Sequence, residues 1–482
     1  MLFSVYTLGC KLNQLETEAI TDSFCREGFT FIPWNALKRC SAQPWLMIIN
    51  TCTVTSMAEQ KARRFIRKLL REHPAMCLII TGCYAQVEQD AISALEVREG
   101  RAPERLFVIP GEIKDSLLDL PRLLADAGAV KALLPTLISS WLDTLLSGLV
   151  SKETADGAFR LQPENFASHS RAFLKVQDGC DRRCAYCRVS IARGKSRSLG
   201  AEEVLKTLTS LEERGFAEAV IAGVNVTQYL DASGANIHGV DTALDLAGLL
   251  DFLLSKTETI RLRLSSIEPD WLAAVDFTKI LAHPRIRPHF HLSVQSGSAE
   301  VIAKMGRPYT PADIERTTAL LRSIRQDPFL ACDIIAGFPG ESEEDFTKTI
   351  TLCETIGFAW IHAFPFSRRP GTAAYDFPER VSEKDATERV KLLTDLARKG
   401  RREYIARWEG KEVEAVIESD ENLPKGFVPG VSENYLKLCI SYGDEPTPAP
   451  GTLARCRIVG NREGAAGNGE QEMGDRVLCL LA

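Results

Sequence analysis

The stretch VQDGCDRRCAYC, residues 176–187, decides how the whole chain is interpreted. Its three thiols follow a Cys-x3-Cys-x2-Cys pattern, and an aromatic side chain, Tyr186, stands before the last of them. Three thiolates this close together can hold three irons of a cubane cluster, which leaves the fourth iron open to a substrate or cofactor. The pattern therefore predicts a redox-active iron–sulfur site at Cys180, Cys184 and Cys187.

A structural zinc site is the alternative interpretation of this run, with His169 or a distant thiol completing the ligand set. Structural zinc and ordinary ferredoxin-like clusters both take four protein ligands. The run supplies only three, so it favours the open cluster.

Alternating strands and helices continue from Arg171 onward. Parallel strands joined by crossover helices predict a partial (β/α)6 barrel, whose chemistry gathers at the carboxyl ends of its strands. The cysteine run directly follows the first strand, and a helix over residues 383–402 closes the domain. The six expected strands are AFLKVQ, EAVIAG, RLRLSS, HFHLSV, FLACDIIAG and FAWIHAFPF.

The first 110 residues also alternate short apolar runs with helical stretches, which predicts a parallel sheet with helices on its faces. Cys10, Cys52 and Cys83 each follow one of these runs, in LGCK, NTCT and TGCY. Ligands collect beyond the carboxyl ends of parallel strands, so these thiols are expected to converge on a second three-thiolate site. Small buried apolar positions are the alternative interpretation of the three.

Short β-like runs separated by Gly, Pro and Asn begin near Gly410 and predict a small antiparallel β-barrel. Its GNREGAAGNGEQ stretch reads as a long turn. The fold class is therefore α/β with a small β-barrel at the end. The expected organisation is an amino-terminal domain over residues 1–135, a linker over 136–165, the partial barrel over 166–402 and the small barrel over 403–482.

Composition places the chain among cytoplasmic proteins. Apolar residues make up 45% of it, charged residues 25%, and no apolar stretch is long enough to span a bilayer. Fourteen cysteines in a reducing compartment indicate metal ligation and core positions rather than disulfides. A net charge of −6 gives no global signal for nucleic acid, so any such partner must be met by local basic patches.

Two segments provide local positive charge of the kind that contacts phosphates. KARRFIRKLLR, residues 61–71, carries six basic residues, and residues 182–197 carry another six beside the cysteine run. A solvated helix face is the alternative for the first segment. The predicted RNA contacts are Lys61, Arg63, Arg64, Arg67, Arg193, Lys195 and Arg197.

With these segments in order, the chain resembles the radical S-adenosylmethionine methylthiotransferases over nearly its whole length. NTCTVT, RLRLSSIEP, HLSVQSGS and DIIAGFPGESEEDF match segments of that family, and the small barrel matches its TRAM domain. The resemblance implies two [4Fe-4S] clusters, a radical cluster on the 180–187 run and an auxiliary sulfur-transfer cluster on Cys10, Cys52 and Cys83. It also implies S-adenosyl-L-methionine as cofactor, and we expect its contacts at Tyr186, Gly223, Asn225, Ser266, Glu268, Gln295 and Asp333.

Within the family, TLGCKLNQLETE around Cys10 is most similar to the branch that acts on N6-threonylcarbamoyladenosine at position 37 of tRNA. That branch inserts sulfur at C2 of the adenine by radical chemistry and methylates it. The expected partners are tRNA, an electron donor such as flavodoxin or ferredoxin, and a sulfur source. The alternatives are isopentenyladenosine tRNA or a ribosomal protein aspartate as substrate, or a non-catalytic metal-containing RNA-binding protein.

Overall fold

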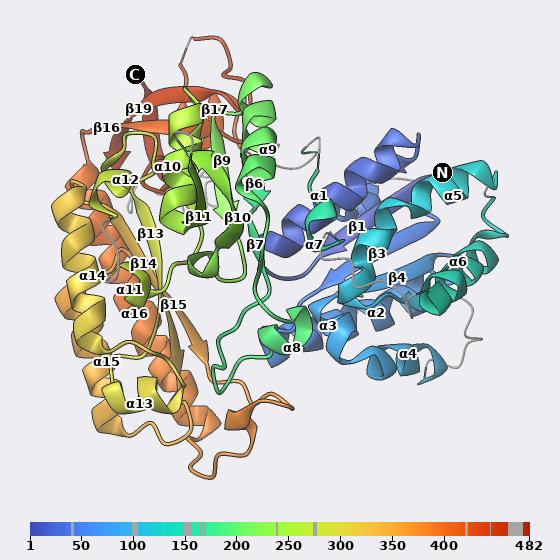
Figure 1. Ribbon diagram of the computed structural model, residues 1–482, viewed down its shortest axis with the longest axis horizontal. Coiled ribbons are helices and arrows are strands. Elements are labelled where there is room, and N and C mark those ends of the chain that lie inside the picture. Colours follow the sequence, from blue (N-terminus) through green and yellow to red (C-terminus); the bar gives the residue numbers. More distant parts are fainter. Residues whose placement is uncertain are drawn as a thin grey trace.

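The computed structural model shows three parts, drawn in Figure 1 as a blue and cyan unit, a green to orange unit and a red unit. The residues that it describes are 1–39, 43–98, 105–128, 130–148, 157–163, 166, 170–237, 240–272, 277–419, 423–443, 445–460 and 476–482. No helix within these ranges is both long enough and apolar enough to cross a membrane. His169 and most of the GNREGAAGNGEQ stretch lie outside the described residues.

The amino-terminal part is a five-stranded sheet in the order β2-β1-β3-β4-β5, and every pair in it is parallel. Its central strands β3 and β4 are buried along their whole length, as strands covered on both faces must be. The predicted alternation is confirmed. The strands are β1 (Leu2–Thr7), β2 (Thr30–Phe31), β3 (Leu46–Thr51), β4 (Cys77–Gly82) and β5 (Leu106–Val108), and the helices among them are α1 (Lys11–Arg26), α2 (Ser56–Glu72), α3 (Cys83–Val87) and α4 (Gln89–Arg98).

The segment expected to be a linker packs onto this first part. Helix α6 (Leu134–Gly148) buries Leu134 and Ile138 fully in the amino-terminal core, and Leu161 joins the same cluster. The reason lies in the apolar residues of α6, which recur at helical spacing and give the helix a face to bury. The structured parts of 136–165 therefore extend the amino-terminal core, while residues 149–156 and 164–165 lie outside the described residues.

The middle part contains the six predicted parallel strands in chain order. Two three-stranded ladders, β12-β9-β6 and β13-β14-β15, are joined by isolated parallel bridges from Leu262 to Ile286 and from Ile267 to Leu292. The predicted partial barrel is confirmed. Its strands are β6 (Ala172–Lys175), β9 (Glu218–Ala222), β12 (Arg261–Leu264), β13 (His289–Gln295), β14 (Phe329–Ala336) and β15 (Trp360–Pro365).

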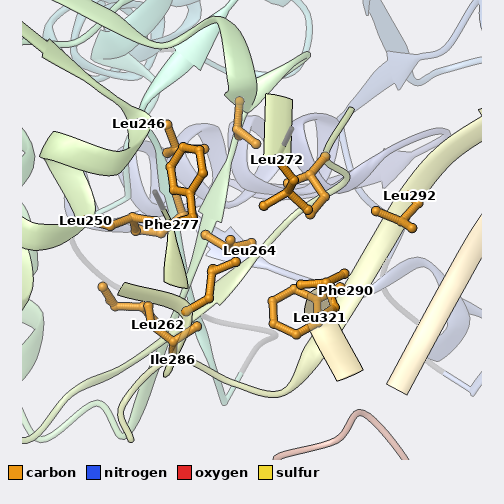
Figure 2. Close-up of a cluster of buried hydrophobic side chains, with 14 of the residues drawn as sticks. Leu246, Leu250, Leu262, Leu264, Leu272, Phe277, Ile286, Phe290, Leu292 and Leu321 are labelled. Carbon is orange, nitrogen blue, oxygen red and sulfur yellow. The ribbon is translucent and has the colours of Figure 1, made fainter. Parts of the chain in front are cut away.

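Helices cover the outer face of these strands, and apolar side chains fill the space between the two layers. Figure 2 shows Leu246 and Leu250 of α10 near Leu262 and Leu264 of β12 in this core. Burying such a side chain contributes about 1.5–3 kcal/mol, so the strands form a rigid support for their tips. The main covering helices are α9 (Ala201–Glu213), α10 (Leu246–Lys256), α14 (Pro311–Ile324), α15 (Glu343–Ile356) and α16 (Glu383–Trp408).

The carboxy-terminal part is a closed five-stranded barrel in the order β16-β17-β18-β20-β19. Four of its five pairs are antiparallel, as predicted, but β18 and β20 pair in parallel. A closed ring with an odd number of strands cannot alternate direction throughout, so one parallel pair is unavoidable. The strands are β16 (Glu412–Ile417), β17 (Phe427–Ser432), β18 (Lys437–Ser441), β19 (Leu453–Gly460) and β20 (Val477–Leu481).

Candidate active site

A cavity of about 600 Å³ lies where the three parts of the chain meet. The amino-terminal sheet contributes the three predicted thiols, the middle part contributes strand tips, and the small barrel contributes residues 435–437. Its size is that of a site for a small molecule or an extruded base. The cavity brings the predicted sulfur-transfer thiols beside Gly223 and Ser266, which follow the carboxyl ends of β9 and β12. It also extends to the first residues of β13, β14 and β15, which are His289, Phe329 and Trp360.

Cys10, Cys52 and Cys83 approach this cavity from three different elements. Cys10 precedes α1, Cys52 follows β3, and Cys83 begins α3. Gly9 has φ +131°, and a Cβ on it would stand 2.8 Å from the Cys52 Cβ, so only glycine allows the first two loops to approach this closely. The strand ends thus place three distant thiols on one wall, as the sequence predicted.

These three thiols lie within electrostatic reach of one another. Burial, together with negative charge on Cys10 and Cys83, raises the pKa of Cys52 to about 12. Burial also raises the pKa of Cys10, and the nearby Arg193 guanidinium partly offsets this by lowering the same pKa. Three thiolates grouped in this way, two of them buried, need positive charge beside them, and iron ions supply it, so the group fits an iron–sulfur cluster.

Within the described ranges, no three His, Cys, Asp or Glu side chains converge on the position of a single metal ion. In a cubane cluster each thiolate binds a different iron, so the ligand sulfurs surround the cluster rather than one point. The spread of both cysteine groups is compatible with that arrangement.

The 180–187 run forms a tight loop held by its own backbone. The Cys187 amide donates to the Cys184 carbonyl at 3.1 Å, and the Cys180 amide donates to the Gly194 carbonyl at 3.0 Å. Gly179 has φ +73°, and a Cβ there would stand 1.9 Å from the Lys195 carbonyl oxygen. The three thiols are therefore positioned locally, on one loop that follows the first barrel strand.

Burial raises the pKa of all three thiols in this loop, and that of Cys184 to about 11. The Arg307 guanidinium opposes this effect at Cys184 and Cys187. The loop thus resembles the first thiol group in its chemistry, because its thiolates also need a metal to be stable.

Arg307 is a residue that the sequence analysis missed. Its Nη1 donates to both carboxylate oxygens of Glu268 at 2.6 Å, and its Nη2 donates to the Tyr186 hydroxyl at 2.7 Å. Nothing in the local sequence around Arg307 marks it, because its role depends on the loop and strand tip that the fold brings to it. It fixes Tyr186 and Glu268 beside the cysteine loop.

Among the predicted cofactor contacts, Gly223 and Ser266 line the cavity directly. A Cβ on Gly223 would stand 2.8 Å from Gln177 Oε1, which accepts a hydrogen bond from the Asn225 amide. The Asn225 side chain lies beside Cys180 and lowers the pKa that burial raises there. Its Nδ2 is buried and has no hydrogen-bond partner among the described residues, so it is available to a ligand.

Of the remaining predicted contacts, Gln295 has a strained backbone conformation, and Asp333 is paired with another side chain. Gln295 ends β13 with φ +63°, a conformation that costs a residue with a side chain free energy and is concentrated at functional sites. Asp333 Oδ1 lies 3.1 Å from His291 Nε2, and the imidazoles of His291 and His362 hold the Asp333 pKa below its usual range despite burial. Glu268 and Asp333 are thus already paired, with Arg307 and His291 respectively.

One predicted RNA contact, Arg193, requires correction. Its side chain is only 5% exposed, because it donates to Cys83 Sγ at 3.2 Å and pairs with Glu16 and Asp178 at 3.0 Å each. A guanidinium in this position cannot reach the phosphate backbone. It is instead a buried partner of the auxiliary thiols.

The other six predicted RNA contacts lie nearer the surface. Arg63 donates to the Tyr84 hydroxyl at 2.8 Å, and Arg67 is partly buried. The exposed members of the set are Lys61, Arg64, Lys195 and Arg197.

A buried charge cluster, which we call the Glu16 cluster, joins the first two parts of the chain. Glu16 of α1 pairs with Lys114, Lys175 and Arg193, and Asp178 pairs with Lys175 and Arg193. The three cations hold the pKa of Glu16 well below its usual range although burial opposes this. Removing one member of such a cluster leaves a buried charge uncompensated, so the cluster fixes the two sheets relative to each other.

Two sequence models match the chain. The model of the Radical SAM superfamily matches residues 174–353, which contain the cysteine loop, and a model described as Uncharacterized protein family UPF0004 matches residues 3–99, which contain the other three thiols.

Curated relatives match almost the whole length. Threonylcarbamoyladenosine tRNA methylthiotransferase MtaB of Treponema pallidum (strain Nichols) is 40% identical over 96% of this chain and 99% of its own. The protein of the same name from Aquifex aeolicus (strain VF5) is 31% identical over 90% and 97%. A tRNA-2-methylthio-N(6)-dimethylallyladenosine synthase of Chlorobaculum tepidum is 29% identical over 92% of each chain.

Proposed function

The chain belongs to the radical S-adenosylmethionine methylthiotransferases, and from that premise we propose that it modifies N6-threonylcarbamoyladenosine at position 37 of tRNA to the 2-methylthio derivative. The observation that carries the proposal is the shared cavity, in which three thiols of one sheet face the strand tips of the other. Sulfur insertion needs a sulfur source and a radical source at one base, and in this cavity the auxiliary thiols share the lining with Gly223 and Ser266, two of the proposed cofactor contacts.

Two [4Fe-4S] clusters and S-adenosylmethionine complete the enzyme. Cys180, Cys184 and Cys187 would hold the radical cluster, and Cys10, Cys52 and Cys83 the auxiliary cluster. When bound, these groups supply one-electron cleavage of the sulfonium, hydrogen abstraction at an unactivated carbon and delivery of sulfur. The protein's own residues bind, orient and shield the reactants.

Four strand-tip features suit a nucleoside cofactor beside the cysteine loop. Gly223, which lacks a side chain, and Ser266, which carries a hydroxyl, both line the cavity. The side-chain Nδ2 of Asn225, which has no hydrogen-bond partner in the described part of the chain, and the strained Gln295 belong to the same group of strand-tip residues. We assign them to the cofactor, with Tyr186, Glu268 and Asp333 held by their partners as supporting residues.

The substrate assignment follows the relatives, since the two with the higher identity are named for threonylcarbamoyladenosine tRNA. Exposed Lys61, Arg64, Lys195 and Arg197 are the proposed phosphate contacts. A tRNA, a flavodoxin-like or ferredoxin-like electron donor and a sulfur source would be the partners. The cytoplasm, where tRNA and reduced thiols occur together, is the proposed location.

The test uses full-length protein reconstituted anaerobically with iron and sulfide. It is incubated with S-adenosylmethionine, a reductant and tRNA that already carries threonylcarbamoyladenosine, and the digested nucleosides are identified by mass spectrometry. We expect the 2-methylthio derivative. Product from isopentenyladenosine tRNA, with none from the threonylcarbamoyl tRNA, would contradict the substrate assignment.

A further inference from the structure

The cavity is lined by positive charge without compensating carboxylates. Lys11, Arg193, Arg401 and Lys437 are among the described residues on its wall, and none of those residues is Asp or Glu. Arg193 is neutralised behind the wall by Glu16 and Asp178. Lys11 and Lys437 add positive charge to this wall, which favours an anionic group in the cavity.

Lys11 is the cation closest in sequence to the auxiliary thiols, because it directly follows Cys10 and begins α1. A cation in the first turn opposes the helix dipole, and this turn contains no acidic residue to offset it. In the described part of the chain, its ammonium contacts the ring of Tyr435, whose centroid lies 5.5 Å away. Its position is unfavourable unless a ligand brings negative charge.

The nearest buried carboxylate is already engaged elsewhere. Glu218 pairs with Arg263 at 2.6 Å and with Arg287 at 2.8 Å, and both its side-chain oxygens accept from these guanidiniums. Arg171 also lies 3.6 Å from Glu218, so this carboxylate balances three arginines and leaves Lys11 as a cation for another anion.

Tyr435 gives this cation a fixed aromatic neighbour from the small barrel. It stands between β17 and β18 with φ +67°, and its amide donates to the Ser432 carbonyl at 2.9 Å. The His289 ring lies 4.1 Å from the Tyr435 ring, and the Arg263 guanidinium lies 5.1 Å from it. A side chain held in a costly backbone conformation and packed from two sides is a preorganised wall.

We propose that Lys11, beside the Tyr435 wall, binds a carboxylate carried by the N6 substituent of the substrate base. This rests on the proposed function, because a threonylcarbamoyl group ends in a carboxylate whereas an isopentenyl group is apolar. A base that presents C2 to the auxiliary thiols carries its N6 substituent along the same wall, where Lys11 follows Cys10. An apolar substituent would leave the ammonium buried and unpaired, which penalises the wrong substrate.

Two other anions could meet this cation, the carboxylate of S-adenosylmethionine and an RNA phosphate. The cysteines of the radical loop do not line the cavity wall that carries Lys11, whereas the auxiliary thiols do. Gly223 and Ser266, assigned to the cofactor, line the same cavity, but Lys11 directly follows the auxiliary ligand Cys10, which favours the substrate carboxylate. The experiment separates the three sources.

The experiment compares two anticodon stem-loop RNAs that differ in one group. One carries threonylcarbamoyladenosine, and the other carries its methyl ester, which removes the negative charge and keeps the phosphates. Reconstituted wild-type enzyme, Lys11→Met, Lys11→Arg and the control Lys206→Met are assayed for kcat/KM. Lys206 is a matched control because its side chain is 79% exposed on α9, outside the cavity.

Wild-type enzyme and Lys206→Met should prefer the acid over the ester by on the order of tenfold to a hundredfold, the range of a charge-assisted contact. Lys11→Met should lower turnover of the acid and should not lower turnover of the ester, so the preference disappears, while Lys11→Arg keeps part of it. In all three variants, the iron content and the cleavage of S-adenosylmethionine without RNA should match those of wild-type enzyme.

The proposal is overturned if Lys11→Met keeps the wild-type preference. Equal loss on both RNAs would also overturn it, because that outcome indicates a phosphate contact or a structural role. Impaired cleavage of S-adenosylmethionine without RNA would assign Lys11 to the cofactor instead. Absence of product from both RNAs with wild-type enzyme would overturn the proposed function itself, and with it the role of Lys11.

Discussion

The two thiol groups are built in opposite ways. Cys180, Cys184 and Cys187 lie on one eight-residue loop whose own amides hold it, whereas Cys10, Cys52 and Cys83 come from three strand ends of one sheet. The first group is a local feature that the sequence displays directly. The second exists only when a domain is folded, and it also depends on Arg193, which reaches it from the partial barrel. We therefore expect the two sites to respond differently to the same kinds of damage.

The largest effect is expected from Cys184→Ala. Because the radical cluster would lose a ligand, both cleavage of S-adenosylmethionine and formation of methylthio product should disappear. About half of the iron should remain, on the auxiliary thiols. Iron analysis and product assays check this, with the exposed Cys25→Ala as a control outside both sites. Retained cleavage in Cys184→Ala would mean that the loop is not the radical site.

Arg193→Met should destabilise the site of Cys10, Cys52 and Cys83, which is assembled from distant elements, and leave the Cys180–Cys187 loop intact. It leaves Glu16 and Asp178 short of a buried partner, so the free energy of unfolding should fall by about 3–5 kcal/mol. Urea denaturation measures this, and the same substitution of Arg122, whose side chain is 79% exposed, should change little. If the two variants were equally stable, the buried cluster would not hold the domains together.

Lowering the pH tests the Glu16 cluster, because protonation of Glu16 removes its charge. Its folded-state pKa lies below the unfolded value, so its contribution to stability is complete above about pH 4.3 and is lost as the pH falls toward the folded value. The neighbouring charges are Lys114, Lys175, Arg193 and Asp178. Denaturation measured from pH 6 downward should show a steeper loss for wild type than for Glu16→Gln. Parallel curves would contradict this role.

The smallest effect is expected from the exposed patch on α2. Lys61→Gln with Arg64→Gln should weaken tRNA binding and lower the slope of its salt dependence by about one for each phosphate that the two side chains neutralise in the wild type. Cleavage of S-adenosylmethionine without RNA should stay unchanged, because neither residue lies near a thiol group. An unaltered salt slope would assign the patch to a solvated helix face.

The sequence predicts the features that are local in the chain and misses those that depend on contacts between distant elements. Alternating apolar runs predicted every strand of the two parallel sheets except the short β2, and strand ends predicted the meeting of Cys10, Cys52 and Cys83. The role of Arg307 and the burial of Arg193 were not predictable, since their partners lie on other elements. Charge in a sequence does not reveal exposure, which explains why the prediction of Arg193 as an RNA contact is wrong.

The packing of α6 and the parallel pair in the small barrel were also missed. Helix α6 has an apolar face in its sequence, but only the fold identifies the amino-terminal core as its partner. The direction of β20 depends on barrel closure, which local β propensity does not encode.

The most direct test of the division between the two sites is the product ratio of Cys52→Ala. Reconstituted variant and wild type are incubated with S-adenosylmethionine, reductant and threonylcarbamoyl tRNA, and cleaved cofactor and methylthio nucleoside are quantified in the same sample. Separate sites predict cofactor cleavage as in wild type with no methylthio product. Methylthio product at the wild-type level would show that the auxiliary thiols are not the sulfur site and would contradict the account.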